Sequence, residues 1–199
     1  MSTVRDSTAR STGREEILSA AVELFAAKGY SRVSIRELAA RAGCSTANLY
    51  HHFPSKYAIC VSLIEGAMDQ HFAGLQEALE RSDDPVEQLR HVLRNHLVVH
   101  MTRPEVRLLD ADLHPVTGPE RDRFIAERDR YERGVRAIVE RGVETGAMRV
   151  RDPALAVRAA MGACTSVDRW FDPRGPLTAA EVADRTADYL VAGFGTAAA

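Results

Sequence analysis

Apolar residues recur at steps of three and four along most of the chain, and this spacing restricts its fold more than any other feature. One long stripe consists of Ile64, Met68, Phe72, Leu75 and Leu79. Residues spaced in this way lie on one face of an α-helix, whereas a half-buried strand needs strict alternation, which no long stretch of the sequence shows. The 199 residues are therefore expected to form an all-α protein of about nine helices.

Capping residues mark where the expected helices begin. Ser34 stands three residues before Glu37, and Thr178 stands three residues before Glu181, which is the spacing of a capping box. At residues 84–85 and 152–153 an aspartate is followed by proline, which favours the first position of a helix. The expected helices cover residues 14–28, 34–41, 45–51, 55–81, 84–101, 105–112, 120–145 and 152–170, with a last helix from residue 178.

Composition narrows the class of protein. No run of about 18 apolar residues occurs, and the first residues contain no apolar segment of a secretion signal, so the protein is expected to be cytoplasmic, without a membrane partner. Cys44, Cys60 and Cys164 lack a paired spacing, which argues against a disulfide framework or a zinc ribbon. Residues 1–12 are rich in Ser, Thr and Arg without an apolar pattern and are expected to be a disordered tail.

Charge is distributed unevenly along the chain. Residues 1–56 hold eight Lys and Arg against five Asp and Glu, whereas the remaining residues hold 18 against 23. A basic segment joined to an acidic body suggests that the basic segment meets a polyanion, although a difference of a few charges also arises by chance on a protein surface.

Residues 34–56 have the pattern of a helix-turn-helix, in which two short helices are joined by a turn at Gly43. The second helix begins with small, mostly polar residues, which would let its backbone approach base edges in a major groove, while Leu49 and Phe53 face inward. Asn48 and Thr46 are expected to contact bases. Phosphate contacts are expected from Ser34, Tyr50, His51 and Lys56. The same pattern also occurs in all-α proteins that do not bind DNA.

Residues 14–57 resemble the DNA-binding head of the TetR family of bacterial one-component repressors. The resemblance rests on "ILSAAVELFAAKGY" and "VSIRELAARAGCSTANLYHHFPSKYAI" and on their spacing. It implies a homodimer that places two recognition helices in successive major grooves of an operator, and a body that binds a small molecule. It implies DNA contacts at Ser34, Arg36, Ser45, Thr46, Asn48, Tyr50, His51 and Lys56. The corresponding division is a tail at residues 1–12, a DNA-binding domain at 13–57 and an effector-binding and dimerisation domain at 58–199.

Helical spacing also directs several polar side chains into the body. His96 and His100 share a stripe with Leu89 and Leu93, while Arg128 and Tyr131 share another with Phe124, Val135 and Ile138. His96, His100, Arg128 and Tyr131 are therefore candidates for the polar groups of an otherwise apolar effector site.

Two other interpretations of these residues remain open. In the first, Arg128 pairs with acids of its own helix and the histidines are satisfied core residues. In the second, His96 and His100 have the i, i+4 spacing of metal ligands, and Asp110, Asp112 or His114 completes a metal site. The main expectation is that the protein holds neither a metal nor a cofactor.

The segments "RDRYERGVRAIVERGVETGAMR" and "MGACTSVDRWFDPRGPLTAAEVADRTADYLVAGF" resemble the TetR regulators of fatty-acid and sterol-ring degradation that respond to acyl-CoA thioesters. This resemblance implies an acyl or acyl-CoA effector, with Arg128 near its anionic end and Trp170 among its contacts. Packing of the helix end beneath the turn is the alternative for Trp170, and we favour it for Phe171.

Small residues on the last two helices suit a homodimer formed by a two-fold four-helix bundle, although packing within one chain is the alternative. The expected function is a ligand-responsive transcriptional regulator, in which an effector bound between the helices at 55–81, 84–101 and 120–145 releases the repressor from a palindromic operator. The rival hypothesis is an acyl or fatty-acid carrier, or an enzyme without DNA binding. No G-x-S-x-G, H-E-x-x-H or G-x-G-x-x-G motif occurs, so neither an enzyme nor catalytic residues are expected.

Overall fold

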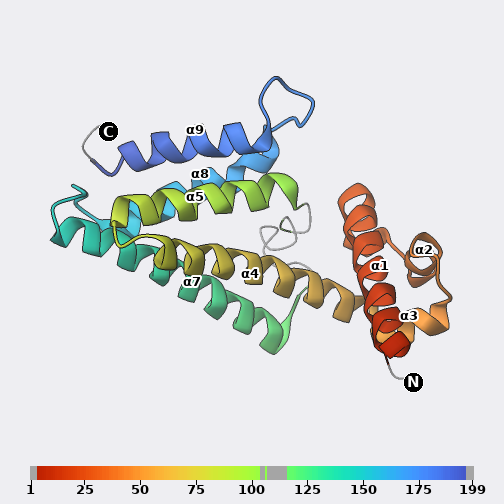
Figure 1. Ribbon diagram of the computed structural model, residues 1–199. Helices are drawn as coiled ribbons and strands as arrows, with labels where there is room; N and C mark the ends of the chain where they lie inside the picture. Colours follow the sequence, from red (N-terminus) through yellow and green to blue (C-terminus); the bar gives the residue numbers. More distant parts are fainter. Residues whose placement is uncertain (1–3, 104–105, 107–115, 196–199) are drawn as a thin grey trace. The chain divides into compact units, whose positions relative to one another are not determined.

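The computed structural model describes residues 4–103, 106 and 116–195, with side chains from residue 13 onward. These residues form α-helices and short 3-10 helices without a strand, which confirms the all-α prediction (Figure 1). The elements in the described residues are α1 (Val4–Lys28), η1 (Tyr30–Arg32), α2 (Ile35–Arg41), α3 (Thr46–His52), α4 (Lys56–Arg81), α5 (Pro85–Thr102), α7 (Gly118–Glu144), α8 (Pro153–Thr165), η3 (Ser166–Arg169) and α9 (Ala179–Ala192). The short helix expected at 105–112 lies outside the described residues, apart from Val106.

The chain forms two compact units. The first contains the described residues of Met1–Gly66 and Pro104–Arg121, and the second contains those of Ala67–Arg103 and Asp122–Ala199. The division between them falls at residues 66–67, within α4. The sequence suggests a boundary at residues 57–58, in the first turn of the same helix.

The capping signals identified most helix starts correctly. Ser34 and Thr178 both form complete capping boxes, and Asp84 and Asp152 each accept a hydrogen bond from a backbone N–H of the first turn. Helix ends were predicted less well. The α-helix that begins at Pro153 ends at Thr165 and tightens into η3 for its last turn, which is common at helix C-termini. Helix α1 begins at Val4, earlier than the apolar pattern predicts.

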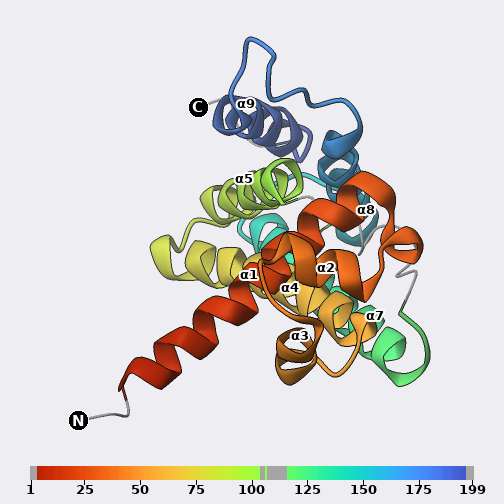
Figure 2. The ribbon, with the colours of Figure 1, turned by 90° about the vertical axis from the view of Figure 1, so that its right-hand side faces the viewer.

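In the first unit, α1 packs against both α2 and α3 (Figure 2). The contact is apolar, since Phe25, Leu38, Leu49 and Phe53 are all buried. Burial of one such side chain contributes about 1.5–3 kcal/mol. This core holds the two short helices in position, because a helix of two turns is not stable on its own in water.

The turn between α2 and α3 depends on Gly43. Its φ of 69° lies in the left-handed region, and nothing lies within 4 Å of the position that a Cβ would occupy. Substitution is therefore penalised by backbone conformation rather than by a clash.

Gly43→Ala is expected to lower the free energy of unfolding of the first unit by about 1–2 kcal/mol, because alanine is strained at positive φ. Gly66→Ala provides the matched control, since Gly66 lies in α4 and a Cβ there also meets nothing within 4 Å. That change is expected to stabilise the helix by about 0.4–1 kcal/mol. Urea unfolding followed by circular dichroism measures both, and equal effects of the two substitutions would refute this role of Gly43.

In the second unit, α5 runs beside α9 and also contacts α8 (Figure 1). Its buried stripe includes Leu89, Val92, Leu93 and Leu97, as the helical spacing predicts. Helix α4 approaches α5 closely at Gly74, where an added Cβ would clash with the side chain of Asn95.

None of the helices in the described ranges combines the length and the hydrophobicity needed to cross a bilayer.

Candidate functional site

Helix α3 presents a polar face while one residue anchors it. Leu49 is fully buried, whereas Thr46, Asn48, Tyr50 and His51 are exposed. Phe53, directly after the helix, is also buried. The structure thus confirms the predicted division between inward anchors and an exposed polar face.

The N-terminus of α3 is capped by a residue that was expected to contact DNA. The Ser45 hydroxyl accepts a hydrogen bond from the backbone N–H of Asn48, at 3.1 Å. The hydroxyl keeps its own proton as a donor, so capping does not prevent a second hydrogen bond.

Ser34 is exposed and caps α2. Its hydroxyl donates to the Glu37 carboxylate at 2.8 Å, and Lys28 bonds the same carboxylate at 2.8 Å. The hydrogen bond from Lys28, followed by those from Ser34, lowers the pKa of Glu37 to about 2. Arg36, in the first turn of α2, is exposed.

Lys56 has a different environment from the one expected. Its side chain is half-buried, and Nζ donates to the carbonyl oxygens of Tyr30 (2.9 Å) and Val33 (2.8 Å). The ammonium also lies 4.3 Å from the centre of the Tyr30 ring. Lys56 therefore holds η1 in place, and at most one of its three N–H bonds remains for a phosphate.

Four aromatic side chains form a buried cluster in the second unit, which we call the histidine cluster: His71 of α4, His96 and His100 of α5, and Tyr131 of α7. The His96 ring stacks on the His71 ring with centroids 4.3 Å apart and on the His100 ring with centroids 4.5 Å apart. The Tyr131 hydroxyl lies 3.5 Å from Nδ1 of His96. Inward orientation of His96, His100 and Tyr131 is thus confirmed.

Burial keeps the three imidazoles neutral. Desolvation lowers the pKa of His71 to about 3 and that of His96 well below its usual range. Desolvation also lowers the pKa of His100 to about 4, against the opposing effect of the Asp168 carboxylate. Burial raises the pKa of Tyr131, and neighbouring Cys164 adds to that shift. The cluster is uncharged near neutral pH and two of its nitrogens, Nδ1 of His71 and Nε2 of His96, have no hydrogen-bond partner.

His71 was missed by the sequence analysis, although a signal was present. It lies three residues after Met68 and four before Leu75, both of which belong to the apolar stripe assigned to this helix. A titratable residue in such a register is a candidate for the interior, as His96 and His100 were.

The prediction that Arg128 faces the interior is wrong, because its side chain is exposed. Phe124 and Tyr131 of the same stripe are buried, whereas Arg128 lies at the edge of that stripe. A long side chain at this position reaches water, which avoids the cost of burying an unpaired cation. Trp170 is 57% exposed, so neither of these two residues joins the histidine cluster in the single chain.

The alternative metal site cannot be traced as predicted, since Asp110, Asp112 and His114 lie outside the described residues. Within the described part of the chain, His71 is the titratable side chain that lies beside both His96 and His100. One donor atom from each of His71, His96 and His100 lies within 4.8 Å of the others.

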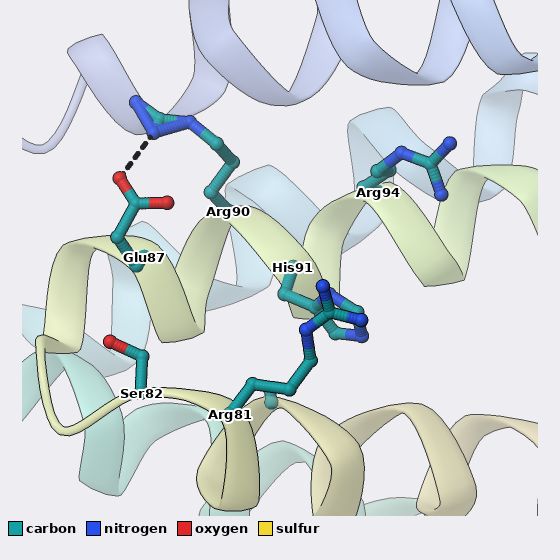
Figure 3. Close-up of a pocket in the computed structure, with 7 residues that line it drawn as sticks. Arg81, Ser82, Glu87, Arg90, His91 and Arg94 are labelled. Atoms are coloured by element: carbon teal, nitrogen blue, oxygen red, sulfur yellow. Dashed lines mark hydrogen bonds and ion pairs between the residues drawn. The ribbon is translucent and has the colours of Figure 1, made fainter.

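A pocket of about 260 Å³, separate from the histidine cluster, lies between the end of α4 and the start of α5 (Figure 3). Arginines and a histidine dominate its lining: Arg81, His91, Arg90 and Arg94. Arg90 pairs with Glu87 at 3.0 Å and with Asp188 at 3.0 Å, and Arg94 pairs with Asp184. The pairs with Asp184 and Asp188 link α5 to α9, and all three pairs neutralise much of the positive charge at the pocket.

Comparison with known proteins matches both halves of the chain to families of bacterial regulators. Residues 17–63 match the family described as bacterial regulatory proteins, tetR family, and residues 82–194 match the tetracyclin repressor-like C-terminal domain. The chain is 37% identical to the TetR family transcriptional regulator PfmR from Thermus thermophilus, with a TM-score of 0.81 over 88% of this chain and 97% of that one.

Two other relatives are similar to this chain over nearly its whole length. The HTH-type transcriptional repressor KstR2 of Mycobacterium tuberculosis is 26% identical over 184 residues, covering 91% of this chain and 92% of that protein. AibR, solved in complex with isovaleryl coenzyme A and operator DNA, is 24% identical with a TM-score of 0.79 over 92% of this chain and 99% of that one, and shows the same fold. Because both halves match and PfmR is similar along almost its entire length, this chain belongs to the tetR family of bacterial regulatory proteins.

Proposed function

We propose that the protein is a ligand-responsive repressor that binds a palindromic DNA operator as a homodimer. The observation that carries this proposal is the face of α3, where exposed Thr46, Asn48, Tyr50 and His51 surround a helix fixed by buried Leu49. Small polar side chains at the start of such a helix allow close approach to the base edges of a major groove. The proposal gives the chain no catalytic role, in keeping with the regulators to which it is similar.

The expected contacts fall into two chemical classes. Thr46 and Asn48 would read bases, because hydroxyl and amide groups match the donors and acceptors of base edges. The remaining contacts would hold the phosphate backbone: Ser34, Arg36, Ser45, Tyr50, His51 and Lys56. Ser34 would contribute least of these as the structure stands, since its hydroxyl and its backbone N–H both donate to the Glu37 carboxylate. Lys56 keeps one of its three N–H bonds, because the other two serve backbone carbonyls.

Asn48→Ala is expected to relax preference at one base pair of each half-site, costing about 1–3 kcal/mol on the preferred sequence and little on sequences changed at that pair. Arg36→Ala is expected to weaken binding to all sequences and to lower the salt slope by about 1 per head. Fluorescence anisotropy on a duplex with the palindrome upstream of the protein's own gene, at two salt concentrations, measures both. Arg133→Ala is the matched control, because Arg133 is also an exposed arginine but lies in α7.

An equal loss on every sequence from Asn48→Ala would contradict base reading by this residue. If the protein binds neither its own upstream DNA nor any other duplex in a salt-dependent way, the repressor proposal fails and a small-molecule carrier becomes the better explanation.

The homodimer would form through α8 and α9. Leu155 of α8 is 64% exposed and Tyr189 of α9 is 77% exposed, although both are large and apolar in part. On α8, Ala159 and Gly162 are exposed as well, and their small size permits close approach of another helix. Self-association across these faces would hold two recognition helices about 34–36 Å apart, as an operator with half-sites one helical turn apart requires.

Combining Leu155→Glu and Tyr189→Glu is expected to halve the molar mass in solution, because carboxylates would be buried at the interface. Operator affinity should fall with it. Light scattering after gel filtration measures the mass, with Leu79→Glu on α4 as a control at another exposed leucine. A double variant that keeps the parent mass would place the interface elsewhere.

The effector is proposed to be an acyl-CoA or a similar apolar anion. AibR, which has the same fold, was solved with isovaleryl coenzyme A bound, and KstR2 is a ketosteroid transcriptional regulator. Helix α4 belongs to both units and is the proposed route of coupling, which needs a ligand preference of about 1–3 kcal/mol between the two states. Operator affinity unchanged by a series of acyl-CoA thioesters would exclude this effector class and leave DNA binding intact.

A further inference from the structure

We propose that His71, His96 and His100 form a binding site for one divalent transition-metal ion, with Zn²⁺ as the best match. One donor nitrogen from each imidazole lies within 4.8 Å of the other two, and all three side chains are buried. Imidazole is a common ligand for Zn²⁺. This inference does not depend on the proposed function, because metal binding can be measured without DNA or effector.

Two helices supply the three ligands. His96 and His100 are four residues apart on α5 and therefore lie on one face. His71 reaches them from α4, where Gly74 permits close approach to Asn95 of α5. The rings of His71 and His100 have centroids 5.6 Å apart, with the His96 ring close to both.

Unsatisfied nitrogens favour a ligand at this place. Nδ1 of His71 and Nε2 of His96 are buried without a hydrogen-bond partner. A buried polar atom without a partner is energetically unfavourable, and a metal ion accepting both lone pairs would remove this penalty. The other nitrogen of His96, Nδ1, lies 3.5 Å from the Tyr131 hydroxyl. A hydrogen bond from Nδ1–H to that oxygen leaves Nε2 unprotonated and orients it as a ligand.

The charge of the surroundings also suits a cation. Burial keeps the imidazoles neutral, the form that binds a metal, by lowering the pKa of His71 to about 3 and that of His100 to about 4. The Asp168 carboxylate of η3 acts electrostatically on His100. A carboxylate next to a ligating histidine is a common partner of protein-bound zinc, and it partly compensates the charge of the buried ion.

Binding requires a modest rearrangement of side chains. Bonds of about 2.0–2.1 Å to a tetrahedral Zn²⁺ place ligand nitrogens about 3.3 Å apart, so the donors move together by about 1.5 Å or less. The stacked rings must also turn so that their lone pairs converge. Three protein ligands leave a fourth position open for water or a small anionic ligand, as in zinc sites that bind exchangeable ligands.

The test is metal binding by the full-length protein after treatment with a chelator. Equilibrium dialysis is expected to give one Zn²⁺ per chain, and Co²⁺ is expected to produce the visible absorption of a tetrahedral complex. His71→Gln or His96→Gln should weaken binding by more than about 100-fold, because even loss of a residue that only orients a ligand costs about 10–100-fold. Asp168→Asn should weaken Zn²⁺ binding by about 10–100-fold, because Asp168 would act on a ligand without binding the metal itself. His91→Gln, on α5 but outside the cluster, is the matched control.

Binding that survives both His71→Gln and His96→Gln, or the lack of any Co²⁺ absorption, would overturn the proposal. Circular dichroism establishes that each variant is folded. Should a variant fail to fold, X-ray absorption on the unaltered protein with Zn²⁺ counts the imidazole ligands directly. Three imidazoles support the site, and fewer than three refute it.

Discussion

Lowering the pH from 6 to 5 is expected to reduce the free energy of unfolding of the metal-free second unit by about 3–4 kcal/mol. The three histidines of the cluster have folded-state pKa values below their ordinary value, to about 3 for His71 and about 4 for His100, chiefly because of burial. In the unfolded chain they take up protons near pH 6.5. Between that pH and their folded pKa values, the unfolded state binds more protons, so each histidine lowers stability by up to about 1.4 kcal/mol per pH unit as the pH falls.

Between pH 6 and 5 the effect of histidine protonation on stability can be measured apart from that of the carboxylates. Glu37, Glu77, Asp172 and Glu181 have lowered pKa values because of hydrogen bonds from neighbouring groups, so their contributions to stability are lost only as the pH falls below the ordinary pKa of a carboxyl group, about 4. A fall in stability between pH 6 and 5 therefore reports mainly on histidine protonation.

Denaturant unfolding at several pH values measures this slope, with Trp170 as the only tryptophan of the chain and a reporter in the second unit. His96→Gln should remove about one third of the slope, since glutamine does not titrate. His51→Gln serves as the control, because the side chain of His51 is exposed in the folded protein. If His96→Gln and the parent protein have equal slopes, the cluster is not buried in its neutral form in solution.

Leu49→Ala is expected to destabilise the first unit by about 2–5 kcal/mol and to abolish DNA binding under the same conditions. Leu49 is fully buried and is the only buried residue of α3. Its removal leaves a cavity against α1 and α2, and α3 spans only seven residues, too few to keep its helical form without tertiary contacts. The exposed residues of α3 would then lose their common orientation, although none of them is altered.

Urea unfolding followed by circular dichroism measures the stability, and fluorescence anisotropy measures DNA binding. Leu49→Met keeps most of the side-chain volume and should cost less than about 1.5 kcal/mol. Leu79→Ala removes the same atoms from an exposed leucine of α4 and should change stability by less than about 0.5 kcal/mol. Retention of full stability by Leu49→Ala would show that α3 is held by other contacts.

Most of the fold could be predicted because its signals are local. The capping boxes at Ser34 and Thr178 act over three residues, and helical periodicity acts over three or four, so the sequence alone indicates where helices begin and which side of each is apolar. Burial of Leu49, Phe53, His96 and His100 followed from this reasoning.

Periodicity was less informative at the edges of an apolar stripe. It placed Arg128 with Phe124 and Tyr131, but the arginine is exposed. A helical pattern defines the direction of a face only approximately. For a long side chain such as arginine at the edge of that face, the desolvation cost of the cation and the space beside the neighbouring helix determine whether it lies in the interior or in water.

The sequence by itself determined the helical class, the positions of most helix starts and the polar face of the recognition helix, because these depend on residues within one or two turns of each other. Only the tertiary structure brought His71 to His96 and His100, gave Lys56 its partners Tyr30 and Val33, and paired Arg90 with Asp188. These contacts depend on the register and rotation of one helix against another, and the periodicity of a single helix contains no information about either.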